Sequence, residues 1–276
     1  IYVMIYSFHM PLFVFVSGYF SKNLEKVTKN ALKTGLIYLF IHIFIDIITV
    51  NPVPLLTPYW LDWYLLSLFL WRITIKLLHK VKFIIPISFA AALISGFIPQ
   101  IGRNLSLSRT FVLFPFFLIG FFFNKEKIIY IKERLSRSKW FFLLSAIISI
   151  ILFFKNLPIQ ILYFADNYYS VGTSFPVAFF ARFFIIGTAV VMCFCILSII
   201  PEHKYSFTYL GENSLYIFLL HALLVKFVDF IPKNNWWNLT LYIIISGIII
   251  YLLGNRISVM IIQKARNKTI SWIKNY

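Results

Sequence analysis

One histidine lies inside an apolar, aromatic run at the start of the chain. His9 follows Phe8 and precedes Met10-Pro11, and the first twenty residues carry no other ionisable group except tyrosine. An imidazole exchanges a proton near neutral pH, so His9 could act as a general base or a proton carrier. The alternative is a neutral core histidine satisfied by a neighbouring hydroxyl or carbonyl. Composition alone leaves both interpretations open.

Three arginines form a second group of candidates. Arg72 lies in the middle of an apolar run, and because arginine keeps its proton it must face a partner or a water-filled cavity. A guanidinium can bind a phosphate or carboxylate of a ligand, or it can pair structurally with an acid. Arg109 and Arg182 lie near the ends of two other apolar runs and are further candidates.

Two acidic residues lie next to other polar or aromatic groups. Asp62 and Trp63 open an apolar run, where they could contact a substrate or simply anchor the helix at an interface. His42 and Asp46 are four residues apart, on one face of a predicted helix, and we expect them to satisfy each other; the alternative is a role in catalysis.

A late polar segment precedes another apolar run. Asn213 or Ser214 can cap the start of a helix there, which also carries Glu212 and His221 as ionisable residues. Cys193 and Cys195 lie in an apolar run and are predicted to be buried free thiols. No spacing typical of metal ligands occurs, so no metal is expected.

The elements that must position these residues are membrane helices. Apolar residues make up 61% of the 276 residues and charged residues only 13%, against about 25% in soluble domains. The net charge of +17 is spread over short segments between apolar runs, which is typical of loops in a membrane protein and argues against nucleic-acid binding.

The apolar runs predict about nine membrane-spanning helices in one domain, residues 1–276. They are residues 2–20, 31–50, 59–78, 83–99, 110–124, 139–154, 175–200, 210–231 and 239–262. Alternate loops carry most of the lysines and arginines, which predicts a cytoplasmic C-terminus and residue 1 on the outer side. We therefore expect one further helix to precede residue 1.

Four stretches, in order along the chain, resemble the integral-membrane acyltransferase-3 family, in particular its fucose 4-O-acetylase-like and polysaccharide O-acetyltransferase branch. They are Ser7-Phe8-His9-Met10-Pro11-Leu12-Phe13 with Ser17-Gly18-Tyr19, then Trp63-Tyr64-Leu65-Leu66 through Arg72, then Arg109 with Phe114-Pro115-Phe116-Phe117-Leu118-Ile119-Gly120, and last Gly211-Glu212-Asn213-Ser214-Leu215 through His221.

The resemblance implies an all-α, polytopic membrane bundle, which has about ten spans in the family. It implies transfer of an acyl group, most often acetyl from acetyl-CoA, to a hydroxyl of a cell-surface, capsular or exopolysaccharide sugar. The family's first helix, with its histidine base, would lie before residue 1, and His9 would assist that base. Arg72 and Arg109 would bind coenzyme A phosphates or the oxyanion. Substrate-binding roles extend to Asp62, Trp63, Arg182, Glu212, Asn213 and His221.

Three readings of the whole chain remain. The first is this O-acyltransferase, in the plasma membrane of a bacterium, whose partners are the lipid bilayer, acyl-CoA and a carbohydrate. The second is a non-enzymatic component of polysaccharide or lipid export, which would use the same intramembrane charges to line a passage. The third is an inactive relative that lacks the first helix.

Overall fold

A computed structural model describes residues 2–49, 52–59, 62–153 and 157–201, together with scattered positions up to residue 251. The chain divides into two compact units, Ile1–Ile200 and Pro201–Tyr276. In the second unit the structure describes one short helix, α9 (Thr208–Glu212). The single membrane domain that the sequence favours therefore stays a prediction.

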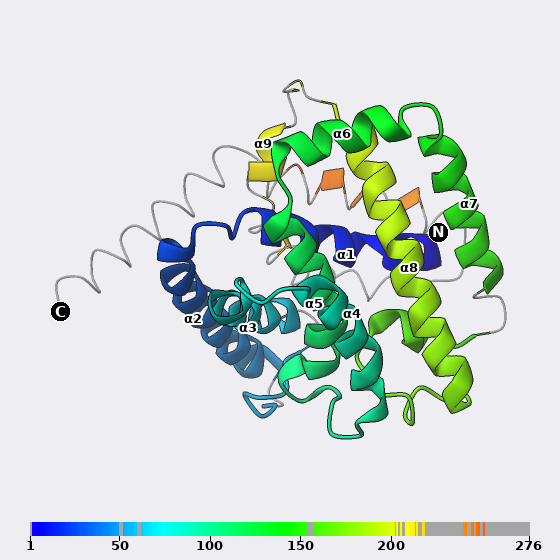
Figure 1. Ribbon diagram of the computed structural model, residues 1–276. Coiled ribbons are helices and arrows are strands. Elements are labelled where there is room, and N and C mark those ends of the chain that lie inside the picture. Colours follow the sequence, from blue (N-terminus) through cyan, green and yellow to red (C-terminus); the bar gives the residue numbers. More distant parts are fainter. Residues whose placement is uncertain are drawn as a thin grey trace. The chain divides into compact units, whose positions relative to one another are not determined.

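The first unit is helical, and its described residues form no strand. Its α-helices are α1 (Tyr2–Tyr19), α2 (Leu24–Thr49), α3 (Trp63–Leu78), α4 (Ile84–Ile94), α5 (Leu107–Phe122), α6 (Lys125–Leu135), α7 (Lys139–Phe153) and α8 (Phe175–Ile199) (Figure 1). Three 3-10 turns, η1 (Ser95–Phe97), η2 (Asn104–Ser106) and η4 (Ile159–Tyr163), lie in the connections.

Three described helices are long and apolar enough to cross a membrane, over Leu24–Ile47, Asn104–Phe122 and Phe175–Ile199. A fourth would be the pair α6 and α7, which bends by 86° (Figure 1). Val3–Tyr19 and Ile84–Phe97 are shorter apolar helices. The described chain is thus an all-helical protein with several candidate spans, and the count of nine stays a prediction.

Two charged segments that we expected to be loops are helical. Helix α2 begins at Leu24, seven residues before the predicted apolar run, because Asn23 caps it by accepting a hydrogen bond from the Lys26 amide at 3.0 Å. Asn124 caps α6 in the same way, accepting from the Lys127 amide at 2.9 Å. Straight-chain lysine and glutamate favour helix once such a cap is present.

Two glycines bring α1 and α5 into close contact. A Cβ atom on Gly18 would lie 2.0 Å from the Phe117 carbonyl oxygen, and one on Gly120 would lie 1.9 Å from the Phe15 carbonyl oxygen. The backbone of each helix therefore occupies the space that a side chain at the glycine of the other helix would fill. Small residues permit this approach between apolar helices.

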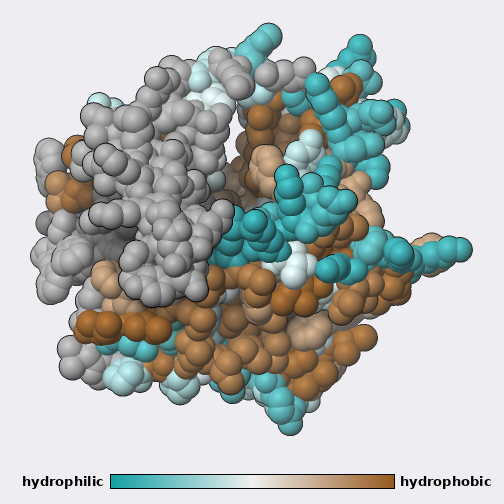
Figure 2. All heavy atoms as spheres, turned by 90° about the vertical axis from the view of Figure 1, so that its left-hand side faces the viewer, coloured by the Kyte–Doolittle hydropathy of each residue, from teal (hydrophilic) through white to brown (hydrophobic). Residues whose placement is uncertain are grey.

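The surface of the described helices is largely apolar. On α2, Leu32, Leu36, Phe40, Ile43 and Ile47 are between 54% and 72% exposed and recur at helical spacing. Figure 2 faces the side of the first unit on which α2 lies and shows brown apolar side chains over much of its described surface. Such a surface suits contact with lipid.

Candidate functional site

Three connecting segments meet at one end of the helices. Residues 52–59, 95–106 and 157–174 are joined by hydrogen bonds, among them Thr57 to Asn104 at 3.2 Å and the Asn167 side chain to the Pro99 carbonyl at 2.9 Å. We call this region the loop end. The start of α3 and the start of α5 lie in it, so it gathers several of the predicted site residues.

His9 is half-buried on α1, and its ring geometry fixes the position of one proton. Nδ1 lies 2.9 Å from the Ile5 carbonyl oxygen, which can only accept, so Nδ1 carries the hydrogen. Nε2 makes no hydrogen bond to any residue that the structure describes. In the neutral ring Nε2 therefore keeps a lone pair, as a general base requires.

Two tyrosines connect His9 to Arg109. The Tyr6 ring packs edge-on against His9, with centroids 4.9 Å apart, and its centroid lies 5.5 Å from that of Tyr163. The Tyr163 carbonyl accepts a hydrogen bond from Arg109 Nε at 3.1 Å. Sequence analysis did not single out these tyrosines, and the only signal for Tyr6 was its place about one helical turn before His9.

Arg109 is half-buried and stacks on Trp63, with its guanidinium carbon 4.9 Å from the ring centroid. Within the described part of the chain it has no carboxylate in salt-bridge range, and its two terminal nitrogens form no hydrogen bond. An aromatic face and one carbonyl thus hold the cation, while the rest of its fork can bind an anion or a polarised carbonyl.

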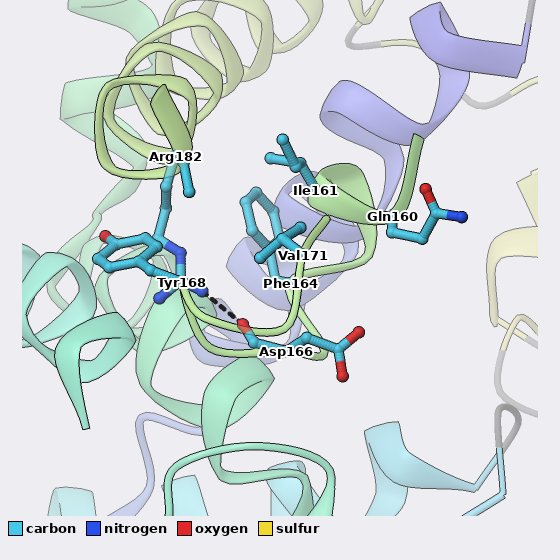
Figure 3. Close-up of a pocket in the computed structure, with 8 residues that line it drawn as sticks. Gln160, Ile161, Phe164, Asp166, Tyr168, Val171 and Arg182 are labelled. Carbon is cyan, nitrogen blue, oxygen red and sulfur yellow. Dashed lines mark hydrogen bonds between the residues drawn. The ribbon is translucent and has the colours of Figure 1, made fainter. Parts of the chain in front are cut away.

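Arg182 lies deeper and has a fuller set of partners. It is 3% exposed, donates to the Asp166 carbonyl at 2.7 Å, and lies 4.5 Å from the Tyr168 ring centroid. Figure 3 shows Arg182, Tyr168 and Asp166 at a small pocket, with the Asp166 carboxylate turned away from Arg182. Arg182 therefore stabilises the conformation of the connecting segment 157–174, to which Asp166 and Tyr168 belong.

The Asp166 carboxylate binds a different arginine. Arg103 contacts it through Nε at 2.8 Å and through a terminal nitrogen at 3.2 Å, which joins two loops in a bidentate pair. This hydrogen bond raises the pKa of Arg103, while burial raises the pKa of Tyr168. Arg103 remains 71% exposed, so solvent screens the pair.

Asp62 is fully buried instead of forming an interfacial anchor. Its Oδ2 lies 2.7 Å from Nδ1 of His42, and the two side chains are 0% and 1% exposed. The expected partner of His42, Asp46, lies 3.9 Å from its other nitrogen and binds Tyr59 and the Val53 amide more closely. The expected contact between His42 and Asp46 is present, but Asp62 is the closer partner, and the four-residue spacing could not indicate it because residues 42 and 62 are far apart in the sequence.

Arg72 lies nine residues beyond Trp63 on α3 and faces the turn between α1 and α2. It donates to Ser21 Oγ at 3.3 Å, to the Asn30 carbonyl at 3.2 Å and to Thr34 Oγ1 at 2.5 Å. All three acceptors are uncharged, so the described residues offer this cation no ion pair. A structural pairing of Arg72 with an acid is therefore absent from the described part of the chain.

Other cations lie near Arg72. The Lys22 ammonium contacts the Phe123 carbonyl and lies 3.9 Å from the Tyr19 ring centroid. Burial and the charge of Lys127 lower the pKa of Lys22. Lys76 donates to Thr28 at 3.1 Å. We call this group of Lys22, Arg72, Lys76 and Lys127 the basic end.

Three candidates from the late polar segment lie wholly or partly outside the described residues. Glu212 ends α9, with its side chain outside the described residues, and Asn213 and His221 lie outside them entirely. The structure thus brings His9, Trp63, Arg109 and Asp62 to the loop end and Arg72 to the basic end. In the described ranges no group of His, Cys, Asp and Glu could hold a metal ion.

Comparison with known proteins agrees with the motifs. A family described as "Acyltransferase domain", the acyltransferase-3 family, matches residues 1–255. None of the curated proteins and none of the solved structures matches the chain. Because the match covers nearly the whole chain and includes all four motif stretches, the chain belongs to the acyltransferase-3 family.

Proposed function

We propose that the protein moves an acetyl group from acetyl-CoA to a hydroxyl of a cell-surface or secreted polysaccharide sugar. The observation that carries the proposal is that two residues of α3, Trp63 and Arg72, belong to two separate groups of candidate site residues. Trp63, at its start, holds Arg109 at the loop end, and Arg72, nine residues later, belongs to the basic end. Those residues are about 13 Å apart along the helix axis, so two different substrates can approach from the two ends.

The loop end suits the acceptor and the reacting carbonyl. His9 Nε2 takes the proton from the acceptor hydroxyl, alone or together with a histidine outside this chain's described residues. The hydroxyl oxygen then attacks the thioester carbon, and the open donors of Arg109 stabilise the charge that develops on the carbonyl oxygen. The carbon–sulfur bond breaks, and the coenzyme A thiolate receives the proton that the base had taken.

The basic end suits the phosphates of the donor. Four cations lie there, and the hydrogen bonds of Arg72, Lys22 and Lys76 go to neutral oxygen atoms, so their charge is available to an anionic ligand. Since coenzyme A is cytoplasmic, we propose that the basic end faces the cytoplasm and the loop end the outside. This orientation agrees with the excess of lysine and arginine in alternate loops.

The base is tested by His9→Gln, which keeps a polar side chain but removes the basic nitrogen. We expect acetyl transfer from radiolabelled acetyl-CoA to polysaccharide to fall by between about a hundredfold and ten-thousandfold, with unchanged affinity for acetyl-CoA. Tyr205→Phe, an exposed change, is the control. Unchanged turnover at normal expression would remove His9 from the chemistry.

The donor site is tested by Arg72→Leu and by Lys22→Gln. We expect both to weaken binding of desulfo-coenzyme A, a non-reactive analogue, measured by calorimetry in detergent. Lys80→Gln removes an exposed charge from the turn after α3 and should leave the affinity unchanged. Equal affinities for wild type and Arg72→Leu would rule out Arg72 as a phosphate ligand.

A further inference from the structure

His42 and Asp62 have the geometry of a catalytic dyad. Nδ1 of His42, on α2, lies 2.7 Å from Oδ2 of Asp62, which directly precedes α3. A carboxylate that orients an imidazole in this way is common where the other ring nitrogen acts as a base. The surroundings of that other nitrogen decide whether His42 can do so.

Nε2 of His42 has no lone pair to offer. It lies 3.2 Å from the Val53 carbonyl oxygen and 3.9 Å from Oδ2 of Asp46. A carbonyl only accepts, so a hydrogen bond at 3.2 Å requires the hydrogen to be on Nε2. The side chain is also 1% exposed. His42 therefore cannot take a proton from a substrate in this arrangement, and it serves to hold neighbouring segments together.

The segments that it holds are residues 52–59 and the start of α3. Tyr38, His42 and Asp46 lie four residues apart on one face of α2. Tyr38 donates to the Leu55 carbonyl and His42 to the Val53 carbonyl. Asp46 accepts from the Val53 amide at 3.1 Å and from Tyr59 at 2.5 Å. One helix face thus holds residues 53, 55 and 59 of the connection that leads into α3.

Asp62 carries this restraint to the loop end. Its carbonyl accepts the amides of Leu65 and Leu66 at 3.0 and 3.3 Å, so it forms the first turn of α3. The next residue, Trp63, is 8% exposed and supports the Arg109 guanidinium. A displacement of Asp62 would therefore move the aromatic face on which Arg109 rests.

We propose that His42 is a positioning residue for acyl transfer. It acts through Asp62 and Trp63 on Arg109, and this inference rests on the role of Arg109 in the proposed function. The hydrogen bonds of His42 go to Asp62 and to the Val53 carbonyl, far from the basic end in the sequence and on other elements, so its effect should appear in turnover and not in the binding of the donor.

A double-mutant cycle tests the proposal. We expect His42→Ala and Trp63→Leu each to lower kcat for acetyl transfer by between about tenfold and a hundredfold, with an unchanged KM for acetyl-CoA. In the double variant the loss should equal that of the worse single variant, because both changes act through the same support of Arg109. If the two losses multiply, or if kcat does not change, the proposal is wrong.

Folding needs a separate check, because His42→Ala leaves the Asp62 carboxylate buried without its partner. Asp62→Asn keeps the shape of the side chain and should also lower kcat with an unchanged KM for acetyl-CoA, by a smaller factor than His42→Ala. Thr188→Val, buried on α8 and bonded to its own helix, is the control for general destabilisation and should leave kcat unchanged.

Hydrogen–deuterium exchange of the detergent-solubilised protein separates this proposal from the proposed function. In His42→Ala we expect faster exchange over residues 52–66 and no change over residues 107–122. That result would support the positioning role even if no acetyl transfer could be measured for the wild type. Unchanged exchange over residues 52–66 would overturn it whatever the activity.

Discussion

The close contact of α1 with α5 leads to the sharpest stability prediction. A carbon atom and a carbonyl oxygen in contact lie about 3.3 Å apart, whereas an alanine Cβ at Gly18 would lie 2.0 Å from the Phe117 oxygen. The Gly18→Ala protein must therefore separate the two helices by about 1 Å. The atoms in the way belong to backbone, so no side-chain rotation can relieve the clash.

The size of the effect follows from two opposing contributions. Overpacking costs up to about 3 kcal/mol, and alanine favours a helix over glycine by about 1 kcal/mol. We expect a net loss of about 2 kcal/mol, or a Tm lower by about 4–8 °C, for Gly18→Ala and likewise for Gly120→Ala. The double variant should lose less than the sum, because helices already separated accept the second methyl group.

The assay is thermal unfolding of the purified protein in detergent, followed by the fraction that remains monodisperse after heating. Gly187→Ala on α8 is the matched control, since a Cβ atom there lies within 4 Å of no atom of the described residues and should leave the Tm equal or higher. Melting of both test variants within about 1 °C of the wild type would show that the glycines do not set the helix spacing.

The loop end supplies the other predictions. Gly96→Ala places a Cβ atom 2.4 Å from the Tyr168 ring, so we expect a lower Tm and faster proteolysis of residues 157–174; equal proteolysis would contradict the packing. Tyr168→Phe removes a hydrogen bond to the Leu93 carbonyl and should cost about 1 kcal/mol in the same melt. Arg103→Gln breaks the exposed pair with Asp166 and should cost less than about 1 kcal/mol. A larger loss that persists in high salt would show that solvent does not screen this pair.

The sequence predicted the helical class and most helix positions because apolar runs have clear ends. The run at residues 2–20 became Tyr2–Tyr19, and the run at 175–200 became Phe175–Ile199. Helix α6 was missed because it is charged, and its start depends on one cap, Asn124. Periodicity and hydropathy do not report such local hydrogen bonds.

The candidate site was predictable as a set of residue types and not as a set of contacts. Arg109 and Trp63 were chosen separately, because each lies near the end of an apolar run and in a different family motif. In the structure the Arg109 guanidinium stacks on the Trp63 ring. The pairing of His42 with Asp62 joins two residues that are twenty positions apart and lie on either side of a loop, and helical spacing does not predict such a contact. Contacts between residues far apart in the sequence depend on the tertiary path of the chain, which sequence patterns do not predict.

The exposed apolar face of α2 also concerns the membrane in which the protein can work. The candidate span Leu24–Ile47 is about 36 Å long, which exceeds the roughly 30 Å hydrocarbon core of a typical bilayer. Lys29 and Lys33 lie in its first half, and their ammonium groups must reach water. These lysines therefore set the depth at which α2 enters the bilayer, with Leu32 near the boundary of the hydrocarbon core.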